Sequence, residues 1–132
     1  MTKIHLPKDC GNSPRQTFLK EFNIAFAKGD ADYLIAHVSD SIAWHIHGKK
    51  TVSGKDAFSQ EIKSMKDNVA DEMILHGIIT HGKQAAAHGE LIIGGLTYAF
   101  CDVYQFAGAK GTILKEIHSY VMAKKGDGSK VG

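Results

Sequence analysis

Three ionisable side chains interrupt apolar, strand-like runs of this sequence, and their types suit proton transfer. His45, Asp102 and His118 each stand among aromatic or aliphatic residues. A neutral histidine can accept a proton near neutral pH because its reference pKa is about 6.5. A carboxyl group among aromatic residues loses hydration, which raises its pKa and lets it act as a hydrogen-bond donor or general acid. We therefore predict His45, Asp102 and His118 as the catalytic residues of one pocket.

The alternation of residue types along two consecutive strand-like runs predicts how this pocket is lined. Side chains two positions apart point to the same face of a strand. On one run this rule places Asp102 on the same face as Phe100 and Tyr104. On the next run it places His118 on the same face as Glu116 and Tyr120. Glu116 would fix the tautomer of His118, and the aromatic rings would form the pocket wall. The predicted substrate-binding residues of these two runs are Phe100, Tyr104, Glu116 and Tyr120.

His45 and His47 are two positions apart, so they share one face of a predicted strand. We predict that this face is the pocket, which adds His47 to the substrate-binding residues. In the alternative register, Trp44 and Ile46 enter the core and both histidines lie on the surface. A shift of one residue exchanges these two outcomes.

A His-x-His pair is also a chelating arrangement, which Asp102, Glu116 or His118 would complete. The two histidines lack a third ligand at close sequence spacing, so we expect no bound metal ion. The sequence has no GxGxxG or GxxxxGKS motif. We therefore expect no nucleotide and no other cofactor.

Capping residues and apolar spacing predict helices followed by strands. Ser13 and Pro14 are typical of a helix start and Gly29 of its end, and a shorter helix follows directly. Ser53 is expected to cap a third helix, with Asp56 three residues further on. The expected strands span residues 42–48, 73–80, 84–93, 97–107 and 113–123. Short glycine-rich connectors between the last four predict antiparallel hairpins, and the order of elements predicts an α+β fold.

Length and composition indicate one domain with no strong charge bias. The chain has 132 residues and a formal net charge of +2. We expect a flexible arm over residues 1–12, one domain over 13–124 and a flexible tail over 125–132. No basic run with interleaved aromatic residues indicates a nucleic-acid partner, and no apolar stretch indicates a signal peptide or a membrane span. Cys10 and Cys101 form no zinc-binding motif. We expect a cytoplasmic protein.

Several segments together resemble a known family. They are Ala27–Asp30, Asp40–Trp44, Ser53–Ala57, Phe100–Phe106 and Ile117–Val121. With this order of elements, residues 14–123 resemble the nuclear transport factor 2-like superfamily, and within it the SnoaL-like and ketosteroid-isomerase-like proteins. The resemblance implies a cone-shaped, curved antiparallel sheet of the cystatin-like type, covered by three N-terminal helices.

The same resemblance bears on the site residues. His45 falls at the position of the carboxylate base of the isomerases, and Asp102 falls at that of their oxyanion-donating acid. Phe22 falls at the position of their oxyanion-binding tyrosine, which adds Phe22 to the predicted substrate-binding residues. Because the base differs and Phe22 has no hydroxyl group, the match argues against a steroid isomerase.

The leading interpretation is a SnoaL-like protein that binds a hydrophobic or amphipathic small molecule in a hydrophobic pocket. If the protein is an enzyme, we expect cofactor-free acid/base chemistry of the isomerase, cyclase, dehydratase or epoxide hydrolase type. The alternative is a non-catalytic, ligand-binding or dimerising accessory domain of the same fold. We also expect a homodimer through the outer sheet face. The surface expected to form it comprises Cys101, Val103, Ile117, Ser119, Val121 and Ala123.

Overall fold

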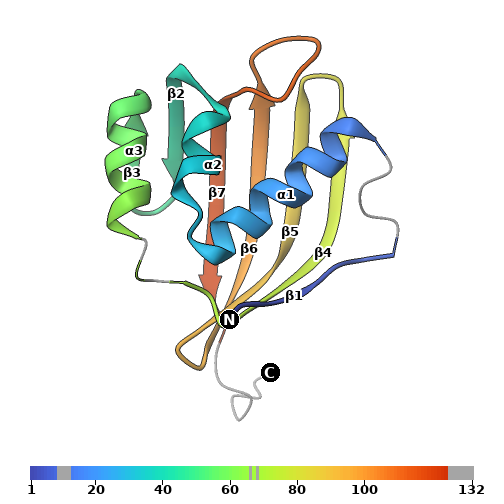
Figure 1. Cartoon of the computed structure of the whole chain (residues 1–132), viewed down its shortest axis with the longest axis vertical. Helices are drawn as coiled ribbons and strands as arrows, with labels where there is room; N and C mark the ends of the chain where they lie inside the picture. Colours follow the sequence, from blue (N-terminus) through green and yellow to red (C-terminus); the bar gives the residue numbers. More distant parts are fainter. Residues whose placement is uncertain (9–12, 66, 68, 125–132) are drawn as a thin grey trace.

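The computed structural model describes residues 1–8, 13–65, 67 and 69–124, and the predicted tail over 125–132 lies outside them. Helices precede the long strands, as predicted (Figure 1). The helices are α1 (Pro14–Lys28), α2 (Ala31–Ala36) and α3 (Lys55–Ser64). The strands are β1 (Lys3–His5), β2 (Val38–Ile46), β3 (Lys50–Ser53), β4 (Glu72–His81), β5 (Gln84–Ile93), β6 (Leu96–Phe106) and β7 (Leu114–Ala123).

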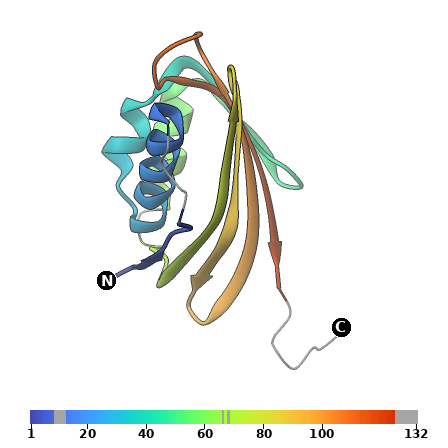
Figure 2. The ribbon, with the colours of Figure 1, turned by 90° about the vertical axis from the view of Figure 1, so that its right-hand side faces the viewer.

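Within the described residues, the strands form one seven-stranded sheet in the order β1-β4-β5-β6-β7-β2-β3. The strands β4 to β7 pair as consecutive antiparallel hairpins, as predicted. In contrast, β1 pairs with β4 and β2 with β7 in parallel. The sheet curves, and α1, α2 and α3 lie against one face of it (Figure 2). This arrangement confirms the predicted α+β fold with a curved sheet. The core side chains lie between the helices and the sheet, and we call this interior the cone.

Helix α1 begins and ends where its capping residues predict. The Oγ of Ser13 accepts a hydrogen bond from the backbone N–H of Gln16 at 3.2 Å, and Pro14 opens the helix. Gly29, with φ 76°, ends it in the left-handed conformation that glycine adopts without a steric penalty. The apolar stripe of α1 is buried against the sheet and comprises Phe18, Leu19, Phe22 and Ala25.

In the described ranges, no helix is long and apolar enough to cross a membrane.

Arg15 joins the start of α1 to two chain reversals of the sheet. Its guanidinium group donates hydrogen bonds to the carbonyl oxygens of Gly82 at 2.8 Å, Gly108 at 2.7 Å and Gly111 at 3.0 Å. The same group lies 4.0 Å above the ring of Phe106. These contacts fix the start of α1 over the chain reversals that join β4 to β5 and β6 to β7.

The N-terminal residues differ from the expected flexible arm. Lys3–His5 form β1, in register with the start of β4. The Lys3 N–H donates to the carbonyl oxygen of Asp71 at 3.0 Å, and the Thr2 hydroxyl group donates to that of Ala70 at 2.7 Å. The edge of β4 therefore gives this segment partners that its sequence pattern did not indicate.

The start of α3 also differs from its prediction. Gly54 is the N-cap, with φ 92°, and no side chain caps this helix by a hydrogen bond. Ser53, the predicted cap, is the last residue of β3. The predicted capping interaction of Ser53 is therefore wrong, because the hairpin of β2 and β3 extends to this residue.

Candidate functional site

Asp102 lies in the middle of β6, on the face of the sheet that the helices cover. Its cross-strand partners are Ala87 on β5 and Ser119 on β7, and both are buried. Phe100 and Tyr104, two positions to either side, are also buried in the core. The alternation predicted for β6 is therefore correct, and it points Phe100, Asp102 and Tyr104 into the cone.

Two chains of hydrogen bonds converge on the Asp102 carboxyl group. On one side, the Tyr104 hydroxyl group donates to Oδ2 of Asp102 at 3.3 Å, and the Asn23 amide donates to that hydroxyl group at 3.1 Å. On the other side, the Ser119 hydroxyl group bonds to the carboxyl group of Asp102 and accepts the indole N–H of Trp44 at 2.9 Å. Tyr104 and Ser119 donate to Asp102 and accept in turn from Asn23 and Trp44. These five residues, which we call the inner network, therefore favour a hydrogen-bond acceptor at the position of Asp102.

Asp102 is the group of the inner network whose charge changes nearest to neutral pH. Burial raises the pKa of Asp102 to about 6, against the hydrogen bonds from Ser119 and Tyr104 that stabilise its carboxylate form. Burial and the neighbouring carboxylate of Asp102 raise the pKa of the Tyr104 hydroxyl group well above its ordinary value. Tyr104 therefore remains protonated and is a permanent hydrogen-bond donor.

His45 and His118 lie on the opposite face of the sheet from Asp102. They pair directly across β2 and β7, and His118 also pairs with Val103 of β6. Val103 lies between Asp102 and Tyr104, which both point into the cone, so Val103 points outward. His118 is its cross-strand partner and His45 is the partner of His118, so both histidines point outward as well. The prediction that the three side chains share one cavity is therefore wrong.

The register of β2 is the alternative one, in which Trp44 enters the core. The indole ring of Trp44 is 5% exposed and lies 5.5 Å from the ring of Phe58 on α3. His45 and His47 consequently point away from the helices. Burying one indole ring outweighs exposing two imidazole rings, because the indole has the larger apolar surface.

A bulge in β7 explains why its ionisable side chains also face outward. The pairing of β6 with β7 shifts by one residue at Lys115, between the pairs Gln105–Glu116 and Phe106–Leu114. Leu114 stays fully buried, whereas Glu116 points to the outer face. Strict alternation from Leu114 would have placed Glu116 and every residue in phase with it inside the cone. The predicted direction of these residues is wrong for this reason.

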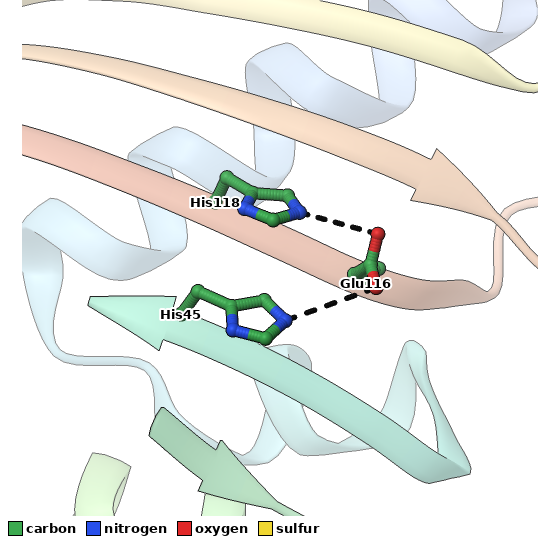
Figure 3. A group of neighbouring side chains, drawn as sticks. All are labelled: His45, Glu116 and His118. Atoms are coloured by element: carbon green, nitrogen blue, oxygen red, sulfur yellow. Dashed lines mark hydrogen bonds and ion pairs between the residues drawn. The ribbon is translucent and has the colours of Figure 1, made fainter. Parts of the chain in front are cut away.

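On the outer face, His45, His47, Glu116 and His118 form a compact group, which we call the histidine cluster. Figure 3 shows three of its members, His45, Glu116 and His118. The Nε2 of His118 lies 3.2 Å from Oε1 of Glu116, and the Nε2 of His45 lies 3.8 Å from Oε2. The Nε2 of His47 lies 2.9 Å from Nδ1 of His118, and Tyr120 stacks on His47 at 4.5 Å. If each of His45, Glu116 and His118 contributes one ring nitrogen or carboxylate oxygen, these three atoms lie within 4.8 Å of one another, so together they could hold a metal ion.

The surface on which the homodimer was expected is divided between the two faces of the sheet. Cys101 and Val103 share the outer face with the histidine cluster, whereas Ile117 and Ser119 are buried in the cone. The bulge at Lys115 separates the two pairs. The large apolar side chains that the outer face does expose are Ile79, Tyr120 and Met122.

Two hollows in the described surface lie on the outer face. The first, of about 520 Å³, is lined in part by His47, His88, Cys101 and Tyr120. The second, of about 280 Å³, lies at the turn between β2 and β3, beside His45. The predicted hydrophobic pocket around Asp102 is neither of these hollows and stays a prediction.

Asn23 and Ser119 belong to the inner network and were not predicted. Asn23 is 5% exposed on the apolar side of α1, where a polar residue needs a partner. Ser119 is two positions from the buried Ile117 and therefore shares its face. This spacing places Ser119 inside once the bulge is known. The predicted residue Phe22 does lie here, because its ring packs edge-on against Tyr104 at 6.1 Å.

Comparison with known proteins places the chain in a family. Residues 19–114 match the family model described as the SnoaL-like domain. The chain belongs to the SnoaL-like domain family. No curated protein matches this SnoaL-like domain in sequence.

Solved structures share the fold of this SnoaL-like domain at low sequence identity. A nuclear transport factor 2-like protein of unknown function from Cytophaga hutchinsonii has a TM-score of 0.65 and 11% identity, over 82% of this chain and 89% of that one. An LEH-like epoxide hydrolase from M. tuberculosis has a TM-score of 0.66 and 19% identity, over 80% of each chain. SalBIII, an epoxide hydrolase/cyclase-like enzyme with a role in pyran ring formation in the polyether salinomycin, has a TM-score of 0.67 and 13% identity, over 82% and 90%.

Proposed function

We propose that this SnoaL-like domain binds a small hydrophobic or amphipathic molecule inside the cone and transfers a proton to or from it through Asp102. The observation that carries the proposal is the inner network, with one carboxyl group held among apolar side chains. The described partners of Asp102 are hydroxyl groups rather than cations. A carboxylate in such surroundings destabilises the fold, so its presence favours a role in chemistry over a role in stability.

The two ionisation states of Asp102 are both accessible near neutral pH. With a pKa of about 6, most of the carboxyl groups are ionised at pH 7 and suit a general base. After accepting a proton, Asp102 would return it as a general acid. Tyr104 and Ser119 would hold the carboxyl group in place during both steps, since each bonds to it directly.

Apolar side chains next to Asp102 suit a hydrophobic ligand. Phe100 flanks Asp102 on β6, and Ile46 pairs with Ser119 and shares its face. Ile46 is only partly buried, so this side of the inner network is the one nearest to solvent. We propose that a ligand enters here and contacts Phe100, Ile46 and the carboxyl group.

The comparisons support the reaction class rather than the substrate. Two proteins of similar fold are epoxide hydrolase or epoxide hydrolase/cyclase-like enzymes. Epoxide opening by water needs a base for the water molecule and an acid for the epoxide oxygen. We therefore propose epoxide opening as the first reaction to test.

The single tryptophan gives a direct test of ligand entry. Trp44 is the only tryptophan in the chain and bonds to Ser119 within the inner network. We expect a small apolar epoxide such as styrene oxide to change Trp44 fluorescence and to be hydrolysed. Asp102→Asn should lower kcat/KM by about 10²- to 10⁴-fold while binding persists. The exposed Asp40→Asn serves as the control with unchanged activity. Turnover that is equal in the wild type and Asp102→Asn would contradict the proposal.

The second candidate function is a dimerising accessory domain without catalysis. It is favoured by the exposed apolar side chains of Ile79, Tyr120 and Met122 on the outer face. A panel of apolar ligands that leaves Trp44 fluorescence unchanged, together with a dimer in solution, would favour this function over the first.

A further inference from the structure

The histidine cluster lies on the face of the sheet that the proposed acid/base chemistry does not use. Two imidazole nitrogens and one carboxylate meet there, from β2 and β7. The strands run parallel, with His45 in register with His118 and Ala43 in register with Glu116. Residues 43, 45, 116 and 118 therefore form a small square on one face, and three of its corners carry metal-ligating atoms.

We propose that His45, Glu116 and His118 bind one divalent transition-metal ion, and that this ion is Zn²⁺. Two histidines and one carboxylate, with a further position for water, are a recurring zinc ligand set. In a tetrahedral site with bonds of about 2.1 Å, neighbouring ligand atoms are roughly 3.4 Å apart. The Nε2 of His118 lies 3.2 Å from Oε1 of Glu116, and the Nε2 of His45 lies 3.8 Å from Oε2. One ligand atom from each of the three residues lies within 4.8 Å of the others, so a contraction of the cluster by about 1 Å brings them to this spacing.

Both ligating rings are directed at the same carboxylate. The imidazole rings of His45 and His118 stack at 4.5 Å with an interplanar angle of 14°, and both Nε2 atoms point to the Glu116 carboxylate (Figure 3). A metal ion at this point needs the two rings to tilt toward each other. The side chains are 29% and 30% exposed and that of Glu116 is 37% exposed, so they have room to move and an ion can reach them from solvent.

The second nitrogen of each ligating ring already has a hydrogen-bond partner. The Nδ1 of His45 lies 3.2 Å from the Thr51 hydroxyl group, and the Nδ1 of His118 lies 2.9 Å from Nε2 of His47. Metal-bound histidines almost always donate their other N–H to such a partner, which fixes the tautomer and the ring orientation. Thr51 and His47 can accept these bonds when both Nε2 atoms are given to the metal. His47 is therefore a positioning residue of the proposed site.

The proposed site removes one of the two reasons for expecting no metal ion. That expectation was based on the lack of a third ligand near His45 in the sequence and on the family resemblance, which implies metal-free chemistry. Parallel pairing of β2 with β7 supplies Glu116 and His118, which are 71 and 73 positions further along the chain. The proposal is independent of Asp102, because the two sites lie on opposite faces of the sheet.

Zinc binding by the full-length, tag-free chain tests the proposal. We expect isothermal titration with Zn²⁺ to give one site per chain, and Co²⁺ to give the intense visible absorption of a four-coordinate site. His45→Asn, His118→Asn and Glu116→Gln should each weaken Zn²⁺ binding at least about tenfold. His76→Asn changes another histidine of the same face, beside His88, and should leave the affinity unchanged.

Circular dichroism of each variant shows whether it is folded. If a variant does not fold, the Co²⁺ spectrum of the unaltered chain still tests the proposal, because that measurement needs no variant. Zn²⁺ binding that survives Glu116→Gln and both histidine substitutions would overturn the proposal. A titration without a site of one ion per chain would do the same and would assign the histidine cluster to hydrogen bonding alone.

Discussion

The indole N–H of Trp44 donates to the Ser119 hydroxyl group at 2.9 Å and thereby links β2 to β7 inside the cone. These strands are parallel neighbours, and the bond spans 75 positions of the sequence. Both partners lie on the buried face of their strands, so His45 and His118, each one position away, lie on the outer face. The bond also holds the Ser119 hydroxyl group beside Asp102.

Removing the Ser119 hydroxyl group should lower the stability of the fold through Trp44 and raise the pKa of Asp102. In Ser119→Ala the buried indole N–H of Trp44 loses its acceptor, which should lower the free energy of unfolding by about 1–3 kcal/mol. The Asp102 carboxylate loses a hydrogen bond that lowers its pKa, so that pKa should rise further. Urea unfolding measures the first effect, and an NMR titration of the Asp102 carboxyl carbon measures the second. An unchanged Asp102 pKa would contradict this arrangement.

Asp102 should make the protein less stable as pH rises. Its pKa in the folded state is about 6 and its ordinary value is 3.8, so the folded state binds the proton more tightly than the unfolded state. The contribution of Asp102 to stability is therefore fully present below pH 4 and is lost progressively up to about pH 6. The shift of about two units corresponds to about 3 kcal/mol. Asp102→Asn should remove this dependence and unfold at higher urea than the wild type at pH 7.5. Equal urea midpoints of the two proteins at pH 7.5 would argue against a buried, ionised Asp102.

The sequence predicts β4 to β7 and the interior of β6 well, because each is a local pattern, whereas the short strands β1 and β3 were not predicted. The two-residue turn Gly94–Gly95 sets the register of β5 with β6, in which Ala87 pairs with Asp102. The caps of α1, Ser13 and Gly29, are likewise local signals that the structure confirms.

The faces of β2 and β7 depend on interactions that sequence patterns do not show. The bulge at Lys115 reverses the alternation of β7, and no residue type in that segment indicates it. The direction of β2 follows from the contact between Trp44 and α3, which joins distant parts of the chain. The histidine cluster therefore could not be separated from Asp102 before the structure was known.

Gly89 should tolerate no side chain. A Cβ atom at this position would lie 2.1 Å from the carbonyl oxygen of Ile74, which is backbone and cannot move aside. Gly89→Ala should therefore lower the free energy of unfolding by at least about 2 kcal/mol. Gly77→Ala is the matched control in the adjacent strand, because its Cβ would meet only the His88 ring, at 3.3 Å. Thermal unfolding of both variants measures the difference, and equal stabilities would contradict the tight approach of β4 to β5.

Arg15 should not be replaceable by lysine. Its planar guanidinium group serves three carbonyl oxygens at once and stacks on Phe106, which an ammonium group cannot do. Arg15→Lys should lower the free energy of unfolding by about 1–3 kcal/mol. Amide exchange near Gly82 and Gly108 should also accelerate, whereas Lys20→Arg should change neither quantity. Unchanged exchange in Arg15→Lys would show that the loops are held by other contacts.

The exposed apolar side chains of the outer face should hold two copies of the chain together. We expect a homodimer in light scattering at micromolar concentration, with a total buried area on the order of 1,200–2,000 Å². Met122 is 68% exposed, and Met122→Glu should shift the mass to that of a monomer. Ile113→Glu, in the loop between β6 and β7, is the control that keeps the dimer. A wild-type monomer would contradict the prediction.

The unpaired Lys115 has an evolutionary consequence. A deletion of this single residue would restore unbroken alternation along β7 and leave every other side chain on its present face. Leu114, Ile117 and Ser119 would stay in the cone, and Glu116 and His118 would stay on the outer face. One codon can therefore be gained or lost at this point without moving ionisable groups between the two sides of the sheet. The faces would exchange only if Lys115 entered the ladder as a paired residue.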